Sequence, residues 1–384
     1  MNNFEYYNPV KILFGNDKIE QLKKEIGDSK KILLTYGGGS IKKNGTYERV
    51  INALSGCNIV EFGGIEANPK YETLLKAIEL GRKNNIDFIL AVGGGSVIDG
   101  SKFIAAAIPF KENPWKIISE QKSIEKAITL GTILTLPATG SEMNSGAVIS
   151  RLETKEKFAF GSPLLFPKFS ILDPTLTFSL PQRQVSNGIV DAFAHVLEQY
   201  LTYPTNSPIQ DRFAESILKT LIEVGPLTLE NPENYEHRAN FMWSCTMALN
   251  GLIATGVPTD WATHMIGHEL TALFGLDHGV TLAIVFPALM RVLIEEKKGK
   301  LLQLGKNVWH IADNEITPEL VIDKIELFFR SLGVKTRLPE YSISFDDVQP
   351  VVIRFKQRNW SIGENKSVNY EVVEKILKKA SETL

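Results

Sequence analysis

Short apolar runs alternate with helical patterns over the first ~180 residues, and this alternation restricts the fold more than any other feature. The runs at residues 31–36 and 88–92 are typical of strands that are buried on both faces. Further strands are expected at 133–136 and 170–172, and residues 73–83 have helical spacing. Continuous apolar strands between amphipathic helices predict a parallel sheet that is covered by helices on both faces.

The pattern changes after Pro181, and the rest of the chain shows helical spacing with almost no strand signal. The expected helices are 188–200, 209–223, 236–253, 261–274 and 322–332. A chain of 384 residues is too long for one simple core and suits two domains. We therefore expect an α/β domain at 1–181 and an all-helical domain at 182–384. The charged run at 295–298 predicts a solvated helix end.

Charge and cysteine content exclude several classes of function. A net charge of -2 gives no electrostatic reason to expect binding to nucleic acid or to an anionic membrane surface. The two cysteines, Cys57 and Cys245, lie far apart and fit a reducing compartment. No basic segment with an apolar run opens the sequence, and no run reaches the ~18 apolar residues of a membrane span. These features predict a cytoplasmic protein.

Two glycine runs follow predicted strands. Gly93, Gly94, Gly95 and Ser96 stand between the strand at 88–92 and the start of a helix, where backbone amides can hold a phosphate. Gly37, Gly38, Gly39 and Ser40 end the strand at 31–36. Carboxyl ends of parallel strands face one crevice, so both runs predict a nucleotide site there. Each run alone also fits a tight turn, and the G-x-G-x-x-G fingerprint of ordinary Rossmann domains is absent.

Acidic and histidine side chains recur at metal-ligand spacing in the second half. Asp191 and His195 are four residues apart in a predicted helix, so they share one face. His264 and His268 repeat this spacing, and His278 follows ten residues later. Any one of these pairs also fits a helix-stabilising pair or a core histidine. In a chain with only six histidines, the combination favours a divalent metal site.

These motifs together resemble the iron-containing, or group III metal-dependent, alcohol dehydrogenases. The resemblance covers the whole chain and includes the segments GGGSVIDGSK at 93–102 and PATGSE at 137–142. By itself the second segment predicts only a loop with a helix cap. Residues 260–264 and 37–43 are most similar to the butanol dehydrogenases and the NADPH-dependent aldehyde reductases.

The resemblance implies a dehydroquinate synthase-like fold, with a dinucleotide-binding domain at 1–181, a metal-binding domain at 182–384 and the active site in the cleft. Its implied metal ligands are Asp191, His195, His264 and His278. His268 and Asp99 are the implied catalytic residues, His268 lying beside the metal without binding it. The implied cofactor residues are Gly37, Gly38, Gly39, Ser40, Asn68, Gly94, Gly95, Ser96, Asp99, Thr139, Asn144 and Lys157. Asn68 is expected after a central strand.

The resemblance also implies hydride transfer between NADPH, or alternatively NADH, and small aldehydes such as butanal. One Fe²⁺ or Zn²⁺ would act as a Lewis acid. A preference for NADPH is expected because the strand ending at Tyr36 runs into the first glycine run with no Asp or Glu in reach, and Lys42 and Lys43 add positive charge. A homodimer is expected, paired through a strand within residues 4–14. The alternatives are a lyase resembling dehydroquinate synthase and a cofactor-binding protein without catalysis.

Overall fold

The computed structural model describes residues 1–27 and 31–383 and divides the chain into two compact units. The first unit combines Tyr7–Pro181 with Pro232–Asn250. The second combines Met1–Tyr6, Gln182–Asn231 and Gly251–Leu384. The change from mixed to helical structure falls at Pro181, where the periodicity of the sequence changes. Periodicity does not predict that Met1–Tyr6 belongs to the helical unit or that Pro232–Asn250 belongs to the α/β unit.

A six-stranded, wholly parallel sheet forms the α/β unit, in the order β1-β8-β5-β4-β2-β3. Its strands are β1 (Lys11–Phe14), β2 (Lys31–Tyr36), β3 (Asn58–Phe62), β4 (Phe88–Gly94), β5 (Thr129–Leu136) and β8 (Phe169–Leu172). The parallel sheet and its four predicted strands, β2, β4, β5 and β8, are confirmed. The expected strand within residues 4–14 is shorter than predicted, because only β1 pairs, at one edge of the sheet.

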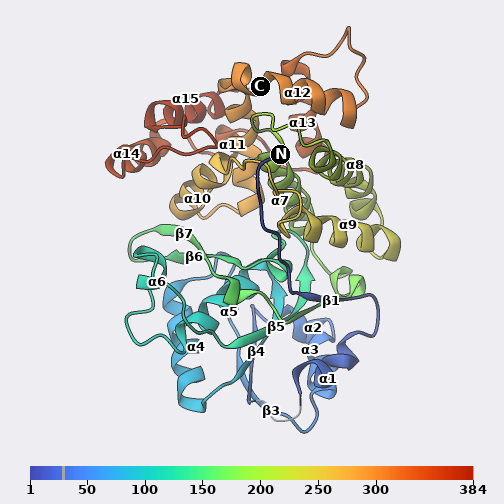
Figure 1. The fold of residues 1–384 in the computed structure, drawn as a ribbon, viewed down its shortest axis with the longest axis vertical. Helices are drawn as coiled ribbons and strands as arrows, with labels where there is room; N and C mark the ends of the chain where they lie inside the picture. Colours follow the sequence, from blue (N-terminus) through green and yellow to red (C-terminus); the bar gives the residue numbers. More distant parts are fainter. Residues whose placement is uncertain (28–30, 384) are drawn as a thin grey trace. The chain divides into compact units, whose positions relative to one another are not determined.

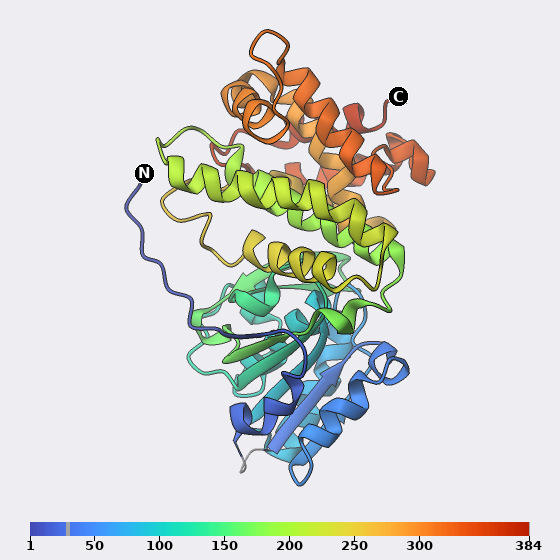
Figure 2. The ribbon, with the colours of Figure 1, turned by 90° about the vertical axis from the view of Figure 1, so that its right-hand side faces the viewer.

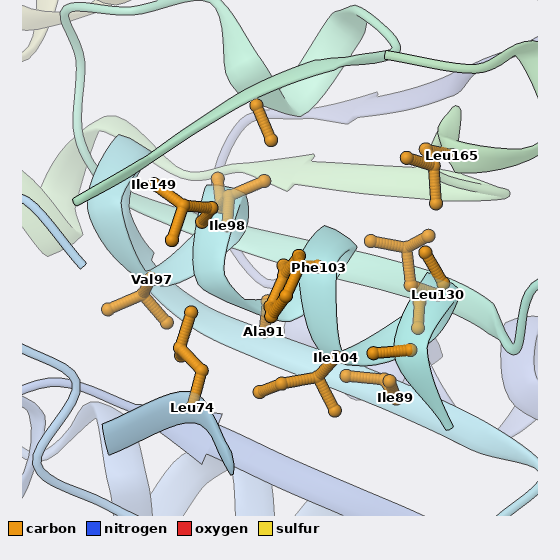
Figure 3. Packing of buried hydrophobic residues seen from close by; sticks show 14 of the residues in the cluster. Leu74, Ile89, Ala91, Val97, Ile98, Phe103, Ile104, Leu130, Ile149 and Leu165 are labelled. Atoms are coloured by element: carbon orange, nitrogen blue, oxygen red, sulfur yellow. The ribbon is translucent and has the colours of Figure 1, made fainter. Parts of the chain in front are cut away.

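Helices cover both faces of this sheet, as Figure 1 shows. One face packs on α4 (Tyr71–Asn84) and α5 (Gly95–Ala107), and the other packs on η1 (Ile19–Gln21), α1 (Leu22–Ile26) and α3 (Thr46–Ala53). In Figure 3, Val97, Ile98 and Ile104 of α5 pack among strand residues such as Ile89 and Leu130. Strand side chains therefore have apolar partners on both faces, which explains their continuous apolar sequence.

Smaller elements complete the α/β unit. An antiparallel hairpin of β6 (Gly146–Arg151) and β7 (Glu156–Gly161), which the sequence patterns did not predict, packs against α5. The other elements are α2 (Ser40–Lys43), α6 (Lys116–Ser119), η2 (Ser141–Met143), η3 (Pro163–Leu165), η4 (Pro174–Thr177) and α9 (Tyr235–Ala248).

The other unit is helical, as predicted. Its helices are α7 (Gln182–Tyr200), α8 (Pro208–Glu230), α10 (Ala262–Phe274), α11 (His278–Val292), α12 (Ile294–Val308), α13 (Pro318–Ser331), α14 (Gln349–Gln357) and α15 (Tyr370–Ala380), with η5 (Leu338–Tyr341) and η6 (Asp346–Val348). Figure 2 shows α7 and α8 side by side. The buried helix α11 packs against α7, α10, α13 and α15 and forms the centre of the unit.

No single helix among the described residues combines the length and the apolar sequence needed to cross a bilayer. The pair α11 and α12 passes that test only jointly, and a bend of 110° separates the two helices.

Candidate metal and cofactor sites

Four residues from three helices converge in the helical unit. Asp191 and His195 lie on one face of α7, His264 lies on α10, and His278 is the first residue of α11. Three histidine Nε2 atoms surround Oδ1 of Asp191: His195 at 3.6 Å, His264 at 3.9 Å and His278 at 3.6 Å. The structure therefore brings together all four residues that the sequence spacing and the resemblance singled out.

A glycine allows His278 to reach this cluster. A Cβ atom added to Gly279 would lie 2.4 Å from the carbonyl oxygen of Asn187, which belongs to the backbone of α7. The start of α11 thus packs directly on α7. The side-chain amide of Asn187 also donates a 2.7 Å hydrogen bond to the carboxylate of Asp277, the residue before α11. These contacts hold His278 beside Asp191.

Glu198, which the sequence patterns missed, orients His264. Its Oε2 contacts Nδ1 of His264, and its Oε1 accepts a 2.6 Å hydrogen bond from the amide of Thr263. A carboxylate bonded to Nδ1 leaves Nε2 available to a metal ion. Glu198 lies seven residues after Asp191 on α7. Because this spacing is close to two helical turns, the sequence indicates that both side chains lie on one face of the helix.

Burial and the neighbouring charges act differently on two of the histidines. Burial lowers the pKa of His195 to about 4, so its ring is neutral at physiological pH. Burial also acts to lower the pKa of His264, but the charges of Glu198 and Asp191 outweigh it and raise the pKa to about 9. A divalent ion would favour the neutral form of His264, because a ligand nitrogen must be deprotonated.

The cluster fits a divalent cation. Ligand atoms of Asp191, His195 and His264 all lie within 4.8 Å of one another, and all three residues are buried. Nε2 of His264 is buried without a hydrogen-bond partner among the residues that the structure describes. A buried nitrogen in this state is costly unless it binds something. Three imidazoles and one carboxylate suit Zn²⁺ and Fe²⁺ equally.

His268 lies one helical turn after His264 on α10 and is only 7% exposed. Its ring centre is 5.2 Å from that of His278 and 6.4 Å from that of His264. It is therefore adjacent to the cluster, and its role as a catalytic residue rather than a ligand stays a prediction.

We expect His268→Ala to keep its bound metal while kcat falls about 10²–10⁴-fold, the range for loss of an acid–base group. Metal analysis of the purified variant, with steady-state kinetics, measures both quantities. Loss of metal as severe as that in His264→Ala would show that His268 is a ligand.

The predicted nucleotide site lies at a switch point of the sheet. The chain passes from β2 outward to β3 and then returns to β4 on the other side of β2. The loops after β2 and β4 therefore separate in opposite directions, and α/β sheets bind ligands at such points. These loops carry the two glycine runs. The second run leads into α5, whose N-cap residue is Gly94. Since glycine has no side chain to accept hydrogen bonds from the first backbone amides of the helix, these amides can bind a phosphate.

Several of the predicted cofactor residues meet around this helix start. A Cβ atom on Gly95 would lie 2.3 Å from Oγ1 of Thr139, so these residues are in close contact. The amide of Asn68 donates to Oγ of Ser96 at 3.2 Å. Lys157 donates to Oδ1 of Asn68 at 2.8 Å. Asn68 follows β3, which is an edge strand, so its expected place after a central strand is wrong.

Asp99 and Asn144 belong to a buried network beneath this loop. Asp99 accepts hydrogen bonds from Oγ of Ser141 at 2.6 Å and from the amide of Val148 at 2.9 Å. The ammonium group of Lys102 bonds to Oδ1 of Asn144 at 3.0 Å and to Oγ of Ser141 at 2.9 Å. Both oxygens of Asp99 thus have protein partners. The catalytic role predicted for Asp99 remains untested, and these contacts favour a positioning role.

The first glycine run has an acidic neighbour that sequence reasoning overlooked. Lys42 lies 3.5 Å from Glu61 of β3 and over the rings of Tyr36 and Tyr47. Hydrogen bonds from Tyr47 and Tyr36 lower the pKa of Glu61, so this carboxylate is charged. The expectation that no carboxylate lies in reach is wrong, because Glu61 comes from the adjacent strand. Both of its oxygens, however, already accept a tyrosine hydroxyl.

Family models match both parts of the chain. The model described as iron-containing alcohol dehydrogenase matches residues 9–174, and the C-terminal model of the Fe-containing alcohol dehydrogenase family matches residues 185–381. The chain therefore belongs to the iron-containing alcohol dehydrogenase family. This membership confirms the resemblance and favours a dehydrogenase over the lyase and the non-catalytic alternative.

Curated relatives and solved structures agree with this membership. The chain is 50% identical to the NADPH-dependent aldehyde reductase YqhD of Escherichia coli over 99% of this chain and 100% of that protein. It is 43% identical to the probable NADH-dependent butanol dehydrogenase 1 of Bacillus subtilis over 98% and 99% of the two chains. Superposition on the crystal structure of the E. coli protein gives a TM-score of 0.97 at 50% identity, covering 99% of both chains. Butanol dehydrogenase A of Thermotoga maritima gives 0.95 at 36% identity, covering 100% and 99%.

Proposed function

We propose that this chain transfers hydride from NADPH to small aldehydes such as butanal, with one Fe²⁺ or Zn²⁺ bound by Asp191, His195, His264 and His278. The broader description, an NAD(P)H-linked alcohol dehydrogenase or aldehyde reductase, follows from its family and relatives. The observation that carries the proposal is the convergence of three Nε2 atoms on one oxygen of Asp191.

When bound, the metal supplies Lewis acidity, which makes an aldehyde carbon a better hydride acceptor. The protein supplies the rest of the chemistry. Glu198 orients His264, and Gly279 allows His278 to complete the ligand set. The amides that begin α5 hold the pyrophosphate of the cofactor. His268, within one turn of His264, delivers the proton that the product alcohol needs, directly or through water.

NADPH is the proposed cofactor for two reasons. The loop after β2 consists of Gly37, Gly38 and Gly39, and Ser40 begins α2, so no carboxylate there is placed to accept a ribose 2′-hydroxyl. In addition, Glu61 is committed to two tyrosine hydroxyls, while Lys42 lies beside the loop. The relative that is 50% identical is named NADPH-dependent, whereas the one that is 43% identical is named NADH-dependent.

Gly39→Asp should weaken NADPH binding by on the order of 1–3 kcal/mol, because a carboxylate there repels a 2′-phosphate. NADH binding should change little. Gly39 has a φ of +94°, so any side chain adds backbone strain. Gly39→Asn adds the same strain without the charge and is the matched control. The measurement is kcat/KM for each cofactor with butanal. A native enzyme with a higher kcat/KM for NADH than for NADPH would contradict the proposed preference.

We further propose that the enzyme is a cytoplasmic homodimer. The cytoplasmic location rests on the two free cysteines, Cys57 and Cys245. The dimer rests on β1, whose outer edge is unpaired among the described residues and can accept the same strand of a second copy. Light scattering at micromolar concentration should give about twice the chain mass of 42.8 kDa. A mass near that of one chain would contradict the dimer.

A further inference from the structure

A buried cluster of three ionisable side chains in the helical unit has no role in the function proposed above. Lys297 of α12 places its ammonium group 2.8 Å from Oδ2 of Asp260 and 2.6 and 2.7 Å from the two oxygens of Glu364. It also donates to the carbonyl of Leu201 at 2.8 Å. The side chains are only 2%, 4% and 6% exposed for Lys297, Asp260 and Glu364. The prediction that the charged run at 295–298 is solvated is therefore wrong for Lys297.

This cluster lies next to the segment that leads into the metal-ligand helix. Oδ1 of Asp260 accepts a 2.9 Å hydrogen bond from the amide of Ala262, and the amide of Asp260 donates to the carbonyl of Glu198 at 2.9 Å. Asp260 therefore connects the Lys297 cluster both to the first turn of α10 and to the backbone of α7. Three residues after Asp260, the amide of Thr263 donates a hydrogen bond to the Glu198 carboxylate that contacts His264.

Trp261, between these contacts, has an unfavourable backbone conformation. Its φ of +63° lies in the left-handed region, which a bulky side chain rarely adopts and which costs on the order of 1–3 kcal/mol. Such strain persists only where surrounding contacts enforce it. Here those contacts are the hydrogen bonds of Asp260. The indole lies against the rings of His264 and His195, with ring centres 5.2 and 6.1 Å apart.

We propose that Lys297, Asp260 and Glu364 are positioning residues for the metal site. They hold residues 260–263 in the strained conformation that aligns Thr263 with Glu198 and Glu198 with His264. Without Lys297, two acidic side chains would be buried with no cation between them, and the segment would rearrange to expose one of them to water. Glu364 holds the ammonium group of Lys297 through both carboxyl oxygens. Lys297 in turn holds Asp260, which accepts a hydrogen bond from the first turn of α10.

The inference rests on the proposed metal site, and its test measures metal affinity rather than turnover. The probe is Co²⁺, which is titrated into the metal-free protein. The visible ligand-field absorption of the bound Co²⁺ reports both its affinity for the site and its coordination geometry. Lys297→Met should weaken Co²⁺ binding about 10–100-fold, the range for residues that orient ligands, and should change the absorption spectrum. Asp260→Asn, which keeps the shape of the side chain, should change both quantities in the same direction and serves if Lys297→Met does not fold.

Lys300→Met is the matched control. Lys300 lies on the same helix and pairs with Asp211 at 2.6 Å, but within the part of the chain that the structure describes neither residue bonds to residues 260–264. It should lose stability while keeping its Co²⁺ affinity. Wild-type affinity and spectrum in both Lys297→Met and Asp260→Asn would overturn the inference, as would equal weakening in Lys300→Met. Failure of the metal site itself is distinguishable, because His264→Ala would then also bind Co²⁺ normally.

Discussion

His264→Ala should abolish both bound metal and activity. In the proposed site His264 is one of four metal ligands. Without its ring, Glu198, which contacts Nδ1 of His264, would remain buried with no imidazole to orient. We expect metal content to fall close to zero and kcat to fall at least about a hundredfold, because Lewis-acid stabilisation is worth several kcal/mol. Metal analysis and steady-state kinetics on the purified variant measure both effects.

His310→Asn is a suitable control for this variant. His310 is exposed and has a φ of +55°, a conformation that asparagine tolerates. It should keep full metal content and activity. If His264→Ala also retains full metal occupancy, the assignment of His264 as a ligand is wrong.

Gly279→Ala should disrupt the metal site by a purely steric route. The added Cβ would lie 2.4 Å from the carbonyl oxygen of Asn187, whereas ordinary contacts begin at 3.4 Å. The obstacle is backbone rather than a flexible side chain, so α11 must move away from α7. Overpacking of this kind costs about 1–3 kcal/mol. His278, the preceding residue, would move with the helix, and a metal site tolerates displacements of only ~0.5 Å.

Thermal unfolding and metal titration of Gly279→Ala measure these two effects, and metal affinity should fall at least about tenfold. Gly299→Ala provides the contrast. Gly299 lies inside α12, and a Cβ added there meets nothing within 4 Å. Helix propensity then predicts a gain of up to ~1 kcal/mol. Wild-type metal affinity in Gly279→Ala would refute the view that this glycine sets the position of His278.

Local periodicity predicted the parts of the fold that depend on neighbours in sequence. The buried strands β2 and β4 were recognisable because apolar contacts on both faces require an uninterrupted apolar run. The Asp191–His195 pair was recognisable because helix geometry places residues four apart on one face. The β6–β7 hairpin gave no such signal, because polar and apolar residues are mixed in its two strands.

The missed residues depend on partners that are distant in sequence. Lys297 is read as a solvated charge because its partners, Asp260 and Glu364, lie 37 and 67 residues away. Glu61 was missed as the partner of Lys42 because strand pairing, not sequence distance, places them together. Glu198 could be predicted in part. Helical spacing from Asp191 indicates the face of α7 on which Glu198 lies, but its contact with His264 depends on how α7 packs against α10.

Whether a metal bound by Asp191, His195, His264 and His278 drives aldehyde reduction can be measured as the rate of NADPH oxidation with butanal while Zn²⁺ or Fe²⁺ is titrated into the metal-free protein. We expect negligible oxidation without metal and a linear rise with added metal that ends at one ion per chain. Full activity in the metal-free protein, or no oxidation at any metal concentration despite one bound ion per chain, would contradict the claim that this site reduces small aldehydes with NADPH.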